Sequence, residues 1–156
     1  KASRYETLRA RLHRGVQRPG LPGAGVYLRR GRTGELRLLE NEAQIERTLE
    51  KLGFEILDPM ALGAEEIACR TLDAPLVVAV EGSQLSHAIY SASPDAVFVV
   101  LQPPARFAMA YKEYTDRVGM RFAFLVGEQA EEGFTVSPDH LLRLLDLVNT
   151  VRSKTT

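Results

Sequence analysis

Three clusters of polar residues in this sequence follow apolar runs, and their residue types suit the binding of an anion. Arg29 and Arg30 close the run VYLRR, Glu81-Gly82-Ser83 follows LVVAV, and Gln102 follows AVFVVL. Paired guanidinium groups can hold a phosphate through parallel hydrogen bonds. A helix that begins just after a glycine and a serine presents unpaired backbone N–H groups, which attract anions. The three clusters therefore predict a phosphate site.

Each of these residues also has a simpler interpretation. Arg29 and Arg30 could form a solvated strand end instead of a phosphate clamp. Glu81 could act as a general base or hold a ribose hydroxyl, or it could only balance the dipole of the following helix. Ser83 and Gln84 could donate hydrogen bonds to a ligand or only cap that helix. The residues alone leave these alternatives open.

The elements that must position these residues alternate between strands and helices. We expect strands near residues 26–30, 54–57, 76–80, 96–101 and 121–126. We expect helices near residues 3–14, 41–52, 63–72, 83–90, 102–118 and from 138 onward. This alternation predicts an α/β fold, in which a Rossmann-like parallel sheet of about five strands carries helices on both faces.

In a parallel sheet the carboxyl ends of all strands meet at one edge, where ligands of such folds bind. The candidate residues at that edge are Arg29, Arg30, Asp58, Glu81, Gly82, Ser83, Gln102, Pro103 and Gly127. Because each of them directly follows a predicted strand, we expect the group to line one binding site.

Two parts of the chain differ in composition and charge. Residues 1–24 predict a helix and a Pro/Gly-rich linker, and residues 25–156 predict a Rossmann-like domain. The net charge is zero, but residues 1–37 hold ten Lys and Arg against two Glu. This basic start could meet phosphate, an anionic membrane surface or an acidic partner domain, or it could simply be solvated.

Several classes of site and protein are excluded by missing patterns. Cys69 is the only cysteine, so an intramolecular disulfide and a Cys-rich metal site are excluded, and a reducing cytoplasm is expected. The three histidines are scattered, and neither a P-loop, a G-x-G-x-x-G after the first strand, a G-x-S-x-G nor a D-x-D occurs. Basic patches interleaved with aromatics are missing, which argues against nucleic acid, and no apolar run approaches 18 residues, which argues against a transmembrane segment. We expect no cofactor and no metal.

Two longer stretches, VYLRRG…LLENEAQIERTLEKLGFEILDP and VVAVEGSQLSHAIYSASPDAVFVVLQPP, resemble the C-terminal half of glycosyltransferase family 61. Its members are often called capsular polysaccharide biosynthesis proteins in bacteria. The family order is a strand ending in Ser/Arg-Arg, an Asn-Glu helix start, a GFE strand, a strand leading to a His-Gly-Ala-Gly-Leu type turn, and an apolar strand ending near Pro. The resemblance covers roughly residues 25–150. It implies a two-domain GT-B enzyme whose C-terminal domain holds the nucleotide-sugar.

The resemblance also implies roles for individual residues. Arg29 and Arg30 would approach the diphosphate. A turn around the nucleotide and its phosphates would be formed by Gly82, Ser83, Gln84 and Leu85. Gln102 would lie beside the base or the ribose. The donor substrate would be a nucleotide-sugar and the acceptor a glycan, with an N-terminal half outside this chain. Transfer would be inverting and metal-independent, in the cytoplasm or at the periphery of a membrane.

One position departs from the family pattern. Many members have His-Gly-Ala where this chain has Glu81-Gly82-Ser83. A carboxylate repels a diphosphate unless it points to the ribose or to the acceptor. Glu81 is therefore the candidate catalytic base of this chain, at the edge where the other candidates lie. The alternative function is a non-catalytic α/β module, a degenerate transferase domain that docks a protein partner.

Overall fold

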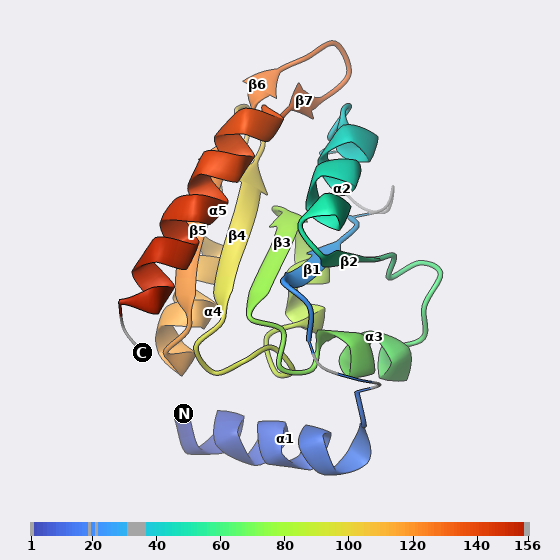
Figure 1. Cartoon of the computed structure of the whole chain (residues 1–156), viewed down its shortest axis with the longest axis vertical. Helices are drawn as coiled ribbons and strands as arrows, with labels where there is room; N and C mark the ends of the chain where they lie inside the picture. Colours follow the sequence, from blue (N-terminus) through green and yellow to red (C-terminus); the bar gives the residue numbers. More distant parts are fainter. Residues whose placement is uncertain (1, 19, 21, 31–36, 155–156) are drawn as a thin grey trace.

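The computed structural model describes residues 2–18, 20, 22–30 and 37–154, and its centre is a parallel sheet (Figure 1). The strand order is β2-β1-β3-β4-β5, and every neighbouring pair is parallel. The bounds are β1 Gly25–Leu28, β2 Phe54–Leu57, β3 Leu76–Val80, β4 Val97–Gln102 and β5 Arg121–Val126. The predicted fold, a Rossmann-like α/β sheet of about five strands with helices around it, is confirmed.

The central strands are buried on both faces, which explains their uninterrupted apolar sequences. All residues of β3 and β4 are buried. Successive side chains of β3 point to opposite faces, so Val78 joins one core cluster and Val77 joins the other. A sheet with two covered faces cannot alternate apolar and polar residues, and these strands were therefore recognisable from composition alone.

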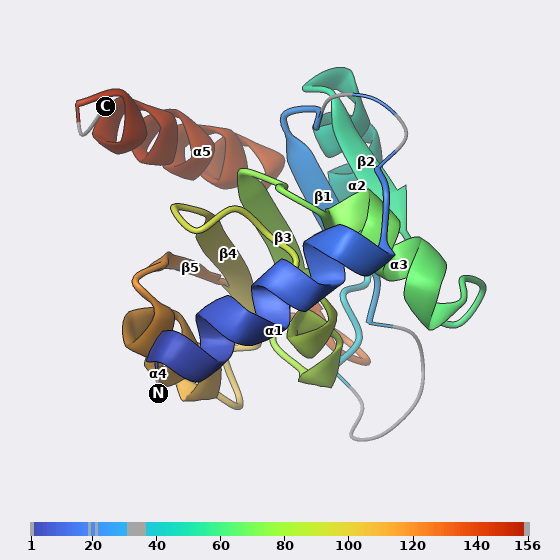
Figure 2. The ribbon, with the colours of Figure 1, turned by 90° about the horizontal axis from the view of Figure 1, so that it is seen from below.

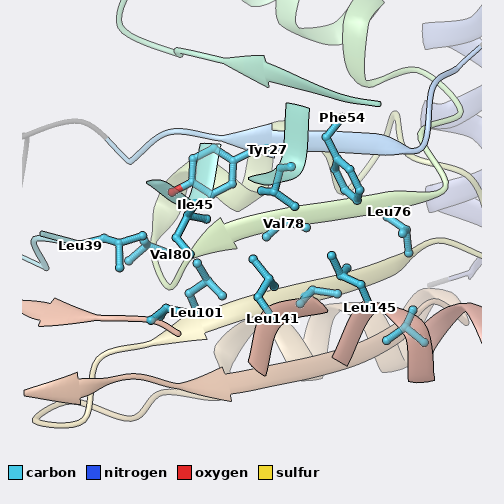
Figure 3. Close-up of a cluster of buried hydrophobic side chains, with 14 of the residues drawn as sticks. Tyr27, Leu39, Ile45, Phe54, Leu76, Val78, Val80, Leu101, Leu141 and Leu145 are labelled. Carbon is cyan, nitrogen blue, oxygen red and sulfur yellow. The ribbon is translucent and has the colours of Figure 1, made fainter. Parts of the chain in front are cut away.

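Helices cover both faces of the sheet. The first face carries α2 (Glu42–Lys51) and α5 (Pro138–Ser153), whose Ile45, Leu141 and Leu145 pack on the strands (Figure 3). The second face carries α4 (Ala110–Val118) and the short 3-10 helix η1 (Ser83–His87), with α3 (Ala64–Thr71) beside η1. Among the described residues, no helix combines the length and the apolar character that crossing a membrane requires.

The N-terminal helix α1 (Ala2–Gly15) lies across the amino-terminal ends of the strands (Figure 2). Tyr5 is buried within the second core cluster. Arg9 forms an ion pair with Asp73, and its Nη1 donates to the carbonyl of Ser91 at 3.1 Å. Arg18 Nη1 donates to the carbonyl of Leu72 at 3.0 Å. Two arginines of the basic N-terminal segment therefore attach it to the sheet domain. The predicted boundary between residues 1–24 and the sheet domain stays a prediction.

The segment after β3 is shorter than expected. The sequence predicts a helix capped by Ser83, but the structure has one 3-10 helix of five residues. Gly82 occupies the N-cap position, no side chain makes a capping hydrogen bond, and Ser83 is exposed. Because the chain turns back toward β4 after Tyr90, little room remains for a longer helix.

The helix after β4 begins later than expected. Gln102 Nε2 donates to the carbonyl of Ala108 at 2.6 Å, and the Ala108 N–H donates back to Oε1 at 3.3 Å. These two bonds hold the intervening residues in an irregular loop, so α4 starts only at Ala110. After β5 the chain forms a small antiparallel hairpin of β6 (Glu128–Gln129) and β7 (Phe134–Thr135).

Candidate functional site

The sheet has a topological switch point between β1 and β3. The chain leaves β1 through α2, on the first face, to reach β2, and leaves β3 through η1, on the second face, to reach β4. In open parallel sheets, ligands bind outside the carboxyl ends of the strands at such a point. Arg30 follows β1 and Glu81-Gly82 follows β3, so the predicted residues meet there.

Two arginines converge on the residue that ends β3. Arg30 Nη1 and Arg37 Nη1 each donate to the backbone carbonyl of Glu81 at 2.9 Å. Arg37 also forms an ion pair with the Glu81 carboxylate. The Glu81 side chain is only 7% exposed and that of Arg37 10%. The end of β3 thus fixes two guanidinium groups at the switch point.

A third arginine and a tyrosine complete the surroundings of Arg30. Burial lowers the pKa of Arg30, and the nearby cations Arg37 and Arg106 lower it further. Burial also raises the pKa of Tyr111, as does the Glu81 charge. We call Arg30, Arg37 and Arg106 the arginine cluster. Neighbouring cations concentrate positive potential around Arg30, and such a site favours an anionic ligand.

Gly82 provides the space in which Arg30 lies. A Cβ atom added to Gly82 would come within 1.6 Å of Arg30 Nη1 and 2.5 Å of Gln84 Oε1. Both atoms are ends of flexible side chains, so a larger residue at position 82 would displace Arg30 from its position on the Glu81 carbonyl. The glycine of the predicted phosphate turn therefore leaves the space in which the Arg30 guanidinium lies.

Arg29 points away from the arginine cluster. Its Nη2 donates to Glu46 Oε2 at 2.7 Å, and its Nη1 lies 3.8 Å from Asp58 Oδ2. The hydrogen bond to Glu46 is the main cause of its raised pKa. Adjacent residues at the end of a strand point to opposite sides, so Arg29 and Arg30 are separated. The two-arginine clamp is not assembled by this pair.

Three of the other predicted residues serve the local structure. Gln84 Nε2 donates to the Val80 carbonyl at 2.5 Å, Gln102 brackets Ala108, and Leu85 is fully buried in the second core cluster. Both glutamine side chains are buried. Their predicted contacts with a nucleotide stay predictions.

A hollow of about 280 Å³ adjoins the arginine cluster. It is lined by Arg37, Pro103, Pro104, Arg106, Gln129, Glu132 and Phe134, among others. The loop after β4 and the β6–β7 hairpin form its walls. Across the described part of the chain, no three His, Cys, Asp or Glu side chains converge as metal ligands would.

Sequence reasoning missed Arg37, Arg106 and Tyr111. Arg37 follows no predicted strand, and the other two lay within a predicted helix. Only the excess of basic residues in 1–37 pointed toward Arg37. The fold brings it beside Glu81, 44 positions further along the chain.

The family model of Glycosyltransferase 61 matches residues 2–99. The chain belongs to glycosyltransferase family 61. The matched region runs from α1 into β4 and contains Arg30, Arg37 and Glu81, whereas Arg106 and Tyr111 lie beyond it. The family resemblance predicted from sequence is confirmed, and a glycosyltransferase of this family acts on a sugar donor and an acceptor.

Comparison with curated proteins finds no match for this family 61 chain. Among solved structures, a flavodoxin-like domain of a Synechococcus protein is 17% identical, with a TM-score of 0.45, over 69% of this chain and 85% of that one. AibC is 16% identical, with a TM-score of 0.40, over 92% of this chain and 46% of that one. At these scores neither likeness extends to function.

Proposed function

We propose that this family 61 chain is the donor-binding domain of a glycosyltransferase and holds the diphosphate of a nucleotide-sugar at the arginine cluster. The observation that carries the proposal is the convergence of Arg30 and Arg37 on the Glu81 carbonyl at the switch point, with Arg106 nearby. A glycan would be the acceptor. The catalytic unit would be of the GT-B type, completed by an N-terminal half, with inversion at the transferred sugar.

The proposed chemistry is electrostatic. When the bond between sugar and diphosphate breaks, negative charge grows on the leaving phosphate oxygens. Guanidinium groups that are already in position stabilise this charge without reorganising. Arg30 and Arg37 are held in this way by the Glu81 carbonyl. Three arginines would supply the positive charge that a divalent metal provides elsewhere, so we propose transfer without a metal.

Glu81 has two possible roles under this proposal, a general base and a positioning residue. Its burial and its ion pair with Arg37 favour the positioning role, because the carboxylate is directed at a guanidinium. Replacing Glu81 with Gln separates the two roles. A positioning role predicts a free energy of unfolding lower by about 3–5 kcal/mol, as when one partner of a buried pair is removed, and an altered affinity for the nucleoside diphosphate. A base role predicts that the affinity for the nucleoside diphosphate stays unchanged and that transfer by the complete enzyme is lost.

The direct test is calorimetric titration with a panel of nucleoside diphosphates and nucleotide-sugars, with EDTA present. We expect Arg30→Ala to weaken binding by about 10- to 100-fold, the usual loss for a charge-assisted hydrogen bond. Arg29→Ala is the matched control, since this neighbouring arginine pairs with Glu46 instead, and we expect wild-type affinity from it. An equal loss of affinity in both variants would show that the arginine cluster is not the diphosphate site.

A non-catalytic module that docks a protein partner is the second candidate. The Glu81 carboxylate inside the arginine cluster favours it, because that charge partly neutralises the site. Failure of the folded wild type to bind any nucleotide would support it.

We further propose that the acting enzyme is bacterial and serves capsular polysaccharide synthesis. We propose a cytoplasmic location, with attachment to a membrane surface as the alternative. The single cysteine fits a reducing compartment.

A further inference from the structure

We propose that this chain forms a symmetric homodimer in which the β5 edges of two copies pair antiparallel. β5 is an edge strand of the sheet, with β4 on one side (Figure 2). Phe124 is 43% exposed and Val126 46% on this strand, whereas β4 is buried throughout. A long, apolar and exposed edge strand is a template for pairing with another chain.

The backbone N–H and C=O groups on the free edge of β5 are spaced as antiparallel pairing with a second copy requires. The N–H groups of Arg121 and Gly127 point inward, to the carbonyls of Ala96 and Gln102. Backbone direction alternates along a strand, so the N–H and C=O groups of Phe122, Phe124 and Val126 point outward. A two-fold axis at Phe124 would align these outward groups with their copies in the partner, which gives three hydrogen-bonded residue pairs.

The side chains of β5 are complementary to themselves around the same axis. Phe124 would lie opposite its own copy, Phe122 opposite Val126, and Ala123 opposite Leu125. Each pair is apolar, and both members lie on the same face of the sheet. A shift by one residue would bring together side chains from opposite faces, so the pattern excludes registers shifted by one residue.

Charges at the strand ends also complement each other in this arrangement. Arg121 begins β5, and Glu128 follows its end after Gly127. Antiparallel pairing brings the start of one strand beside the end of the other. Arg121 would therefore lie across from the partner's Gly127, one residue from the partner's Glu128, and the two-fold axis repeats this opposition of charges at the other end.

Exposed apolar residues on both sides of β5 extend the same surface. On the α4 side, the ring of Phe107 packs edge-on against Phe124 with centroids 5.1 Å apart. On the other side, α5 lies along the sheet beside β5 (Figure 1). Its Asn149 flank faces Phe54 on the β2 side of the sheet. Helical spacing therefore puts Leu147 and Val151 on the opposite flank, toward the β5 edge.

These residues account for half of the large apolar side chains that are exposed in the described part of the chain. Ten are exposed, and five lie at this edge: Phe107, Phe124, Val126, Leu147 and Val151. A cluster of exposed apolar side chains of this kind marks an interaction surface. The opposite edge strand, β2, is different, because its Glu55 pairs with Arg70 at 3.0 Å and leaves charge on that edge.

The test is the molar mass of the purified chain by sedimentation equilibrium over a range of micromolar concentrations. We expect a mass of twice 17.3 kDa for the wild type. Phe124→Lys should weaken self-association by about 30-fold or more, as loss of a central interface residue does. Leu52→Lys is the matched control, since Leu52 is equally exposed (43%) near the other edge, and it should remain dimeric. A monomeric wild type, or a dimer insensitive to Phe124→Lys, would overturn the proposal.

A cross-linking measurement keeps the test independent of any effect of Phe124→Lys on folding. In a Cys69→Ser background, Phe124→Cys should join two copies through a short bifunctional thiol reagent, because the two-fold axis passes beside this position. Glu55→Cys in the same background, on the β2 edge, should give monomer only. Equal cross-linking at both positions would contradict the proposed interface. A monomer that captures another protein through β5 would contradict it as well.

Discussion

At the scale of single residues, Gly82 determines where Arg30 can lie. Replacing Gly82 with Ala introduces a Cβ where Arg30 Nη1 now lies, 1.6 Å away. We expect the displaced guanidinium to weaken binding of the nucleoside diphosphate by about tenfold, as the loss of one charged hydrogen bond does. Titration calorimetry measures this. The control is Gly63→Ala, since nothing lies within 4 Å of a Cβ there, and wild-type affinity is expected. Unchanged binding by Gly82→Ala would show that Arg30 does not bind the ligand.

A second residue-scale prediction concerns pH and the buried Tyr27. Its hydroxyl donates to Glu42 Oε1 at 2.8 Å, and burial, with the Glu42 charge, raises its pKa well above 10. The folded state therefore holds this proton more tightly than the unfolded state. The resulting stability is complete below pH 10 and falls as the pH rises above it. Tyr5 and Tyr111, whose pKa values are also raised, add to the same fall.

The Tyr27→Phe variant isolates the contribution of this hydroxyl. At pH 7 it should lower the free energy of unfolding by about 1 kcal/mol, through the lost hydrogen bond to Glu42. Above pH 10 its stability should fall less steeply than that of the wild type, by about 1.4 kcal/mol per pH unit. Urea denaturation over a series of pH values measures both effects. Parallel pH profiles would show that Tyr27 does not titrate differently on folding.

At the scale of elements, α1 is attached to the sheet domain by specific contacts. Arg9 binds Asp73 and the carbonyls of Ser91 and Ala92, all of which precede β3 or β4. Replacing Arg9 with Met keeps much of the side-chain stem but removes these bonds. We expect the free energy of unfolding to fall by about 2 kcal/mol. The matched control Arg11→Met alters an exposed arginine of the same helix and should change it by less than about 0.5 kcal/mol.

The result for Arg9 also bears on the predicted division of the chain at residue 24. If Arg9→Met loses stability in one cooperative transition, α1 folds as part of the sheet domain. If α1 melts separately, for example as an early change in helix content by circular dichroism, residues 1–24 form an appendage. Tyr5, which is buried in the second core cluster, favours the first outcome.

At the scale of the whole molecule, ligand binding should stabilise the fold without a metal. A nucleotide-sugar at about 100 times its dissociation constant adds about 2.7 kcal/mol to the free energy of unfolding. For a domain of this size that raises the melting temperature by about 5–10 °C. Thermal unfolding should show this rise equally with EDTA and with added Mg²⁺. A rise that requires Mg²⁺ would contradict the proposed metal independence.

The local sequence by itself determined which segments form the sheet and which residues follow its strands. A strand buried on both faces has a continuous apolar sequence, so Leu76–Val80 was predicted with its observed bounds. The apolar run Arg121–Val126 was also predicted with its observed bounds, although this edge strand is only partly buried. The family was also recognisable, because its motifs are local and ordered along the chain. Helix starts were less predictable. The loop before α4 depends on the hydrogen bond from Gln102 to Ala108. Helix propensities of single residues cannot predict such a contact.

Only the tertiary structure decided which of the edge residues meet. The pairing of Arg29 with Glu46 and of Arg30 with Glu81 follows from the strand order and from the alternation of side chains, neither of which composition reveals. Arg37 joins the arginine cluster because the chain passes the end of β3 on its way to α2. Strand positions are local properties of a sequence. A binding site is formed by contacts between distant segments, and these exist only once the sheet is assembled.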